Sequence, residues 1–155
     1  SLSSELPTWV PAWYIDYIVW WKASAHGVLY VGRILMVLTF LAAGGNFGPS
    51  GFTGIARHSG FPVPPFFGVC AFSCVFFGPI LILVGPFFNS MISTIAGAKF
   101  VIIFLAIATY VGHVKPALGA DESTKEGHIM HAMKNVAIIG GFLVMLAHDL
   151  EHLRL

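Results

Sequence analysis

The sequence predicts an all-α membrane protein: a four-transmembrane-helix bundle with an N-terminal interfacial amphipathic helix. Hydrophobic residues make up 57% of the 155 residues and charged residues only 10%, and the mean hydropathy is +0.83. A soluble domain carries about 25% charged residues, and a soluble fold of this length could not hide so many apolar side chains from water. The formal net charge of +1 and the absence of a basic run argue against a nucleic-acid partner.

The N-terminal arm, residues 1–26, contains all four tryptophans of the chain. Read as a helix from about Ala12, it carries an aromatic stripe, with Asp16 and Lys22 lying off that stripe. The stripe consists of Trp13, Tyr17, Trp20, Trp21 and Ser24. Tryptophan and tyrosine favour the headgroup level of a bilayer, so the arm is expected to lie in the membrane interface or against a partner protein, without crossing the membrane.

Four apolar segments follow in a transmembrane domain that we assign to residues 27–150. The expected spans cover about residues 28–45, 66–85, 91–112 and 129–148, and residues 151–155 form a polar tail. Each segment is about long enough for a helix that rises about 1.5 Å per residue to cross a hydrocarbon core of about 30 Å.

Proline and glycine punctuate these segments. In the loop between the first two spans, Pro49 is expected to begin a short helix over Ser50 to Ser59, which Gly60 ends. One face of this helix should carry Phe52, Ile55 and Ala56. Gly78-Pro79 predicts a bend or local unwinding in the second span, because proline lacks the N–H group and its ring clashes with the preceding turn.

The third span carries small residues that suit close contact between helices. They are Ser93, Thr94, Ala96, Gly97 and Ala98.

Several short motifs resemble those of DoxX-like membrane proteins. They are Tyr30-Val-Gly32-Arg33 followed by Phe40-Leu-Ala-Ala-Gly-Gly, Gly51-Phe52 leading to Ser59-Gly60-Phe61-Pro62, Leu-Ile-Leu-Val-Gly85, and Lys134-Asn135 followed by Gly140-Gly141. The resemblance covers Tyr30 to Leu146 and implies a four-helix membrane bundle. It also implies association with sulfur-compound or quinone-linked oxidation complexes, or with other respiratory assemblies.

Two positions depart from the pattern of that family. Asn46 stands where relatives often carry a lysine, and Cys74 or Val75 stands where they often carry an acidic residue. If that acid pairs with the first-helix arginine in relatives, Arg33 has lost its usual counter-ion.

Arg33 and Lys99 are the ionisable residues expected at membrane depth. An ionised side chain at that depth costs roughly 2.5 kcal/mol or more. The cost falls if the group is paired or if its aliphatic stem lets the charge snorkel to the membrane surface. We expect both to face the bundle interior or a protein contact, where they could hold a quinone, an anionic lipid headgroup or a partner's carboxylate. Trp13, Trp20 and Trp21 complete this set of candidate lipid-, quinone- or partner-binding residues.

The histidines are weak candidates for metal ligands: His113, His128, His131, His148 and His152. Spacing places His128 and His131 on one helix face, with His113 on the same side of the membrane. The chain has no carboxylate–histidine motif, and we expect no metal. Asp149 and Glu151 are unfavourable at a helix C-terminus, which suggests an external cation or protein partner for them.

Cys70 and Cys74 share a helix face at i, i+4, and are expected to be small packing residues rather than a disulfide or redox pair. No phosphate loop, hydrolase nucleophile motif or cofactor fingerprint is present. With the acids outside the spans, we expect no buried general base and no catalytic activity of the chain's own.

The sequence therefore favours a structural accessory subunit of a larger membrane electron-transfer complex, respiratory or photosynthetic. The alternatives are a quinone-linked oxidoreductase subunit of the sulfur-compound oxidation type and a small transporter. Expected partners are membrane lipids and other subunits, with no cofactor of its own but lipid, quinone or pigment at its rim. The favoured location is the mitochondrial inner membrane, ahead of thylakoid and bacterial plasma membranes.

Overall fold

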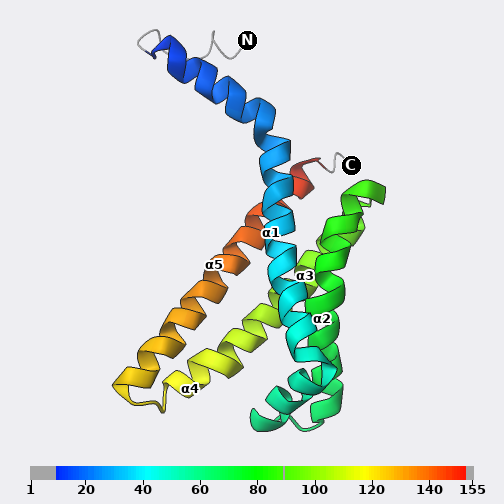
Figure 1. Cartoon of the computed structure of the whole chain (residues 1–155), viewed down its shortest axis with the longest axis vertical. Helices are drawn as coiled ribbons and strands as arrows, with labels where there is room; N and C mark the ends of the chain where they lie inside the picture. Colours follow the sequence, from blue (N-terminus) through cyan, green and yellow to red (C-terminus); the bar gives the residue numbers. More distant parts are fainter. Residues whose placement is uncertain (1–9, 89, 153–155) are drawn as a thin grey trace. The chain divides into compact units, whose positions relative to one another are not determined.

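The computed structural model describes residues 10–88 and 90–152, without the side chains of Lys22, His26 and His152. Within these ranges every regular element is a helix, which confirms the all-α prediction. Figure 1 shows their order along the chain: α1 (Ala12–His58), α2 (Pro64–Val84), η2 (Gly85–Phe88), α3 (Met91–Thr109), η3 (Tyr110–Val114), α4 (Lys115–Ala117) and α5 (Glu122–His152). The chain divides into two compact units, Ser1–Leu35 and Met36–Leu155, and each is described by itself.

Four helical segments in the described part of the chain are long and apolar enough to cross a membrane. They are Gly27–His58, Pro64–Phe88, Met91–Ala117 and Glu122–Glu151. Each contains one of the four spans expected from the sequence, but each is longer than expected. The extra length arises because polar and glycine-containing segments that looked like loops continue the helices.

The first helix shows this most clearly. α1 runs without interruption past residue 26, where the arm was expected to end, and past Gly45, where the first span was expected to end. Its one residue with non-helical dihedral angles is Gly48, at φ 58° and ψ −179°. This conformation is essentially restricted to glycine, and Pro49 next to it disfavours a helical conformation at residue 48. The break in regular helical geometry therefore falls at Gly48, beyond the expected end of the first span at Gly45.

The short helix predicted after Pro49 is present. Its end forms a Schellman motif around Gly60, which has a φ of +80°. The Gly60 N–H donates to the Arg57 carbonyl at 3.1 Å and the Phe61 N–H donates to the Ala56 carbonyl at 3.1 Å. On the face expected to carry Phe52, Ile55 and Ala56, Phe52 and Ala56 are buried and Ile55 is exposed.

α2 and α3 pack closely along their length within the second unit. The helix α2 continues through Pro79 without a break, so the local unwinding expected at Gly78-Pro79 is absent. Gly78 and Pro79 are both buried, and packing of this kind offsets the single backbone hydrogen bond that proline removes. On α3, the small residues Thr94, Gly97 and Ala98 are buried, which confirms their predicted role in helix contact.

A buried stripe on α5 completes the core of the second unit. It consists of Phe142, Met145, Leu146 and Asp149. Their spacing of three, four and seven residues keeps them on one face of the helix. Phe142 packs against Phe40 of α1 with ring centroids 5.7 Å apart and the rings tilted by 58°, and Met36 lies near Gly141. These contacts attach the Met36–His58 part of α1 to α5.

Candidate functional site

The arm carries a continuous row of aromatic rings. Trp13 packs edge-on against Tyr14 with ring centroids 5.7 Å apart, Tyr14 stacks on Tyr17 at 6.3 Å, and Tyr17 meets Trp21 at 6.1 Å. Trp20 and Trp21 are 5.4 Å apart. The expected stripe is thus present as a row of ring contacts. Tyr14, which was not part of the expected stripe, extends this row. Trp9 lies outside the described residues.

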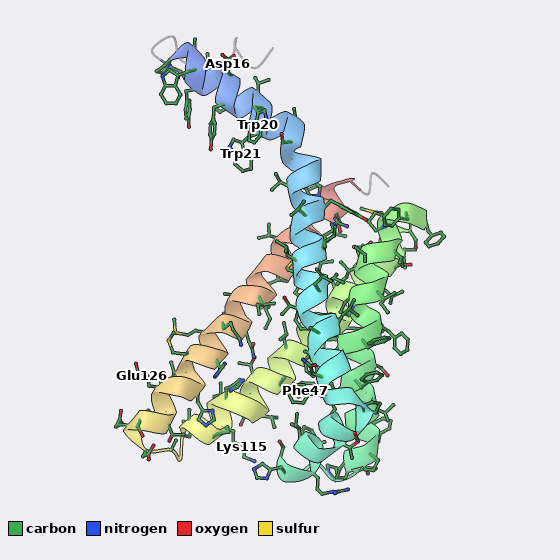
Figure 2. The ribbon with its side chains drawn as sticks, viewed as in Figure 1. Asp16, Trp20, Trp21, Phe47, Lys115 and Glu126 are labelled. Carbon is green, nitrogen blue, oxygen red and sulfur yellow. The ribbon has the colours of Figure 1, made fainter. Side chains whose placement is uncertain are left out.

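Figure 2 shows the rings of Trp20 and Trp21 projecting outward from the helix. Trp13 is 68% exposed and Trp20 is 59% exposed. Large, exposed, adjoining aromatic side chains are typical of surfaces that meet lipid headgroups or a protein partner. The arm is therefore a candidate binding surface.

The two cations expected at membrane depth differ in their surroundings. Arg33 is buried, with 5% of its surface exposed, as expected for a charge turned away from lipid. Lys99 is exposed. It shares an exposed face of α3 with Phe100, Ile103 and Ile107. Of the two positions expected for Lys99, the bundle interior is wrong, because helical spacing turns Lys99 outward while Ala98 and Val101 take the buried positions. Its expected contact with another protein stays a prediction.

Three histidines come together where α3 passes into α5. The His113 ring stacks on that of His131 with centroids 5.1 Å apart and an interplanar angle of 18°, and lies 5.9 Å from that of His128. Lys134 Nζ lies 3.4 Å from His131 Nδ1. We call these four residues the basic cluster. The sequence reading placed the three histidines on one membrane side, and the structure brings their side chains into contact.

A π-helical turn, η3, carries His113 toward α5. The Lys115 N–H bonds to the Tyr110 carbonyl, five residues earlier, instead of the usual four. Pro116 explains this widening, since its ring clashes with the carbonyl of Gly112 and it has no N–H to donate there. The third span was expected to end at residue 112, but the helix continues through η3 and α4, and only a short turn separates α4 from α5. In the sequence, Pro116, four residues after Gly112, was the feature that could have predicted this distortion.

The other end of α5 holds a buried carboxylate. Asp149 is 2% exposed, and its Oδ1 lies 3.6 Å from Nδ1 of the half-buried His148. Its burial does not fit the external cation or protein partner suggested for Asp149, and it shows a buried carboxylate where no buried general base was expected. Asp149 follows Phe142 and Met145 at helical spacing, one turn after Met145. This spacing could have identified Asp149 as a member of the buried stripe. The side chain of His152 lies outside the description.

The arrangement does not favour metal binding or thiol chemistry. Over residues 10–88 and 90–152, no group of three or more histidine, cysteine, aspartate or glutamate side chains is placed to hold a metal ion. Cys70 and Cys74 are free thiols. Cys74 is half-buried, but Cys70 is exposed, so its expected packing role within the chain was wrong.

Neither a protein-family model, nor a curated protein, nor a solved structure matches this chain. Its candidate sites are therefore judged on their own residues.

Proposed function

We propose that the four long apolar helices cross a membrane and that the protein is a structural accessory subunit of a larger electron-transfer complex in that membrane. The observation that carries this proposal is the exposed aromatic row of the arm. A soluble surface rarely exposes adjoining aromatic rings of this size, whereas sites that anchor one subunit to another are enriched in tryptophan and tyrosine.

The exposed face of α3 also supports a role in assembly. Lys99 stands among apolar side chains that are themselves exposed. It lies eight residues after the first residue of α3, a depth of about 12 Å along the helix axis. A cation at such depth needs a partner or must snorkel toward the headgroups. A carboxylate on a neighbouring subunit would satisfy it.

The resemblance of Tyr30 to Leu146 to DoxX-like proteins supports a respiratory assembly as the host complex. The mitochondrial inner membrane is the location we favour, ahead of other membranes. A quinone-linked catalytic role receives less support. Lys99 was one of the two residues expected to line a quinone pocket, and its outward position removes it from the interior.

Native gel electrophoresis of gently solubilised membranes tests this proposal. The tagged protein should migrate in a large complex, and Trp13→Ala together with Trp20→Ala should release it as a free species, of which the chain itself contributes 16.7 kDa. Phe66→Ala with Phe77→Ala is the matched control, because these aromatic side chains of α2 are similarly exposed but lie outside the arm. Resistance to alkaline extraction should be unchanged in all variants, since the spanning helices are intact.

Migration of the wild-type protein only as the free species would refute the proposal. Retention of the arm variant in the complex would show instead that the aromatic row binds lipid and not a subunit.

A further inference from the structure

The basic cluster of His113, His128, His131 and Lys134 is not explained by a role in assembly. Its members come from two elements, η3 and α5, and their rings and ammonium group meet at the distances given above. Packing alone does not account for them, because Lys134 and His131 are exposed and histidine rings are poor substitutes for apolar side chains in a helix contact.

The cluster has no acidic counterpart in the described part of the chain. No carboxylate there lies within ion-pair distance of its four members. The nearest acids in the sequence are engaged elsewhere or point away. Asp121 Oδ1 accepts the Thr124 N–H at 2.9 Å, Glu122 pairs with Lys125 at 3.3 Å, and Glu126 is exposed. Four basic groups thus converge without compensating negative charge from residues 10–88 and 90–152.

The donors of the cluster are suited to an anion. The Lys134 ammonium can only donate, so His131 Nδ1 accepts from it and the proton of neutral His131 lies on Nε2. His113 Nδ1 is buried and makes no hydrogen bond to any described residue. A buried polar atom without a partner calls for a bound water, ion or ligand nearby.

A metal ion fits the same residues poorly. Among the described residues, the three histidines do not form a group placed to hold a metal ion. Lys134 adds a positive charge beside His131, which would repel a cation.

We infer that the basic cluster binds a phosphate group, and that the source of this group is either the headgroup of an anionic phospholipid or free phosphate. A lipid is the source favoured by position, because the cluster lies where two candidate spans approach their connecting turn. Lysine and histidine at such a level attract anionic headgroups. This inference does not depend on the proposed function in assembly.

Native mass spectrometry of the full-length protein in detergent, with short-chain phosphatidic acid added, tests the inference. The wild-type protein should bind this lipid saturably, whereas phosphatidylcholine should not compete. Lys134→Ala and His131→Ala should each weaken binding about tenfold, the expected effect of losing one charge-assisted hydrogen bond. Lys125→Ala is the matched control, since it removes the same charge from the same helix but from a residue paired with Glu122.

Competition identifies the source of the phosphate group. Displacement of the bound lipid by equimolar inorganic phosphate would assign free phosphate, and persistence of the lipid would assign the headgroup. Both outcomes support an anion site.

Histidine NMR on the wild-type protein provides a readout that needs no variant to fold. The imidazole nitrogen signals of His113 and His131 should shift on addition of phosphatidic acid, while those of the exposed His58 should not. Equal lipid affinity in Lys134→Ala, Lys125→Ala and wild type would overturn the inference. So would stoichiometric binding of Zn²⁺ that is lost in His131→Ala.

Discussion

The backbone of Gly97 in α3 lies directly against the carbonyl oxygen of Gly78 in α2. A β-carbon built on Gly97 would overlap that oxygen and would come 2.9 Å from the β-carbon of Leu81. Built on Gly78, it would lie 3.0 Å from Val101 Cγ2 and 3.1 Å from the Gly97 oxygen. Two helices approach this closely only where neither carries a side chain at the contact. In apolar surroundings such as lipid, the hydrophobic effect does not drive helices together, so close van der Waals packing of this kind holds them.

Gly97→Ala should therefore destabilise the protein. We expect a loss of about 1–3 kcal/mol, typical of overpacking, seen as a lower melting temperature by circular dichroism in detergent. Gly140→Ala is the matched control in α5, because a β-carbon there has nothing within 4 Å. Alanine favours a helix over glycine by about 1 kcal/mol, so the control should hold or gain stability. Similar shifts in both variants would contradict the close contact.

The turn at Gly48 predicts a second glycine effect with a different cause. No atom would meet a β-carbon at Gly48, yet its φ of +58° is unfavourable for any other residue. Gly48→Ala should cost about 1–3 kcal/mol of folding stability through backbone strain alone. Gly54→Ala, in the helix that follows and equally open, should not destabilise. Unchanged melting of Gly48→Ala would show that the bend is dispensable or relaxes into a straight helix.

The buried carboxylate on α5 should contribute to stability. Asp149→Ala removes a buried carboxylate whose Oδ1 lies 3.6 Å from His148 Nδ1. Leaving the buried His148 nitrogen without this neighbour should cost about 1–3 kcal/mol of folding stability. Glu151→Ala, two residues later and exposed, is the control and should melt like wild type. Greater loss from Glu151→Ala than from Asp149→Ala would contradict the burial.

The start of α5 should loosen in acid. Hydrogen bonds from the Thr124 side chain and N–H, together with that from Ser123, hold the pKa of Asp121 below its usual value. The folded-state pKa is thus below the unfolded one, so the cap stabilises α5 fully above the unfolded pKa. This stabilisation is lost as pH falls through the folded pKa.

Hydrogen exchange at the Thr124 amide measures this effect. The protection factor of this amide in the wild-type protein should fall as the pH drops below the usual aspartate pKa of about 3.9. In Asp121→Asn the uncharged cap still accepts the hydrogen bond, so protection should not depend on this titration. Glu126→Gln is the control and should keep the wild-type pH dependence. An identical pH profile in Asp121→Asn would rule out Asp121 as the titrating group.

The amino-acid sequence by itself determined that the chain is helical and where its four long apolar helices lie, because composition and length suffice for that. It also identified the short helix after Pro49, its end at Gly60, the small face of α3 and the aromatic stripe of the arm. These features depend on the chemistry of neighbouring residues: proline's missing donor, glycine's access to positive φ, and helical spacing.

Only the tertiary structure decided which face of each helix is covered by protein. It turned Lys99 outward and Asp149 inward, stacked His113 on His131, and kept α2 helical across Pro79. The physical reason is that a side chain's hydropathy reports its preference for apolar surroundings, whether lipid or another helix provides them. When a helix is apolar on every face, the pattern of its side chains does not show which face meets lipid and which meets another helix. Only the packing of one helix on another shows that.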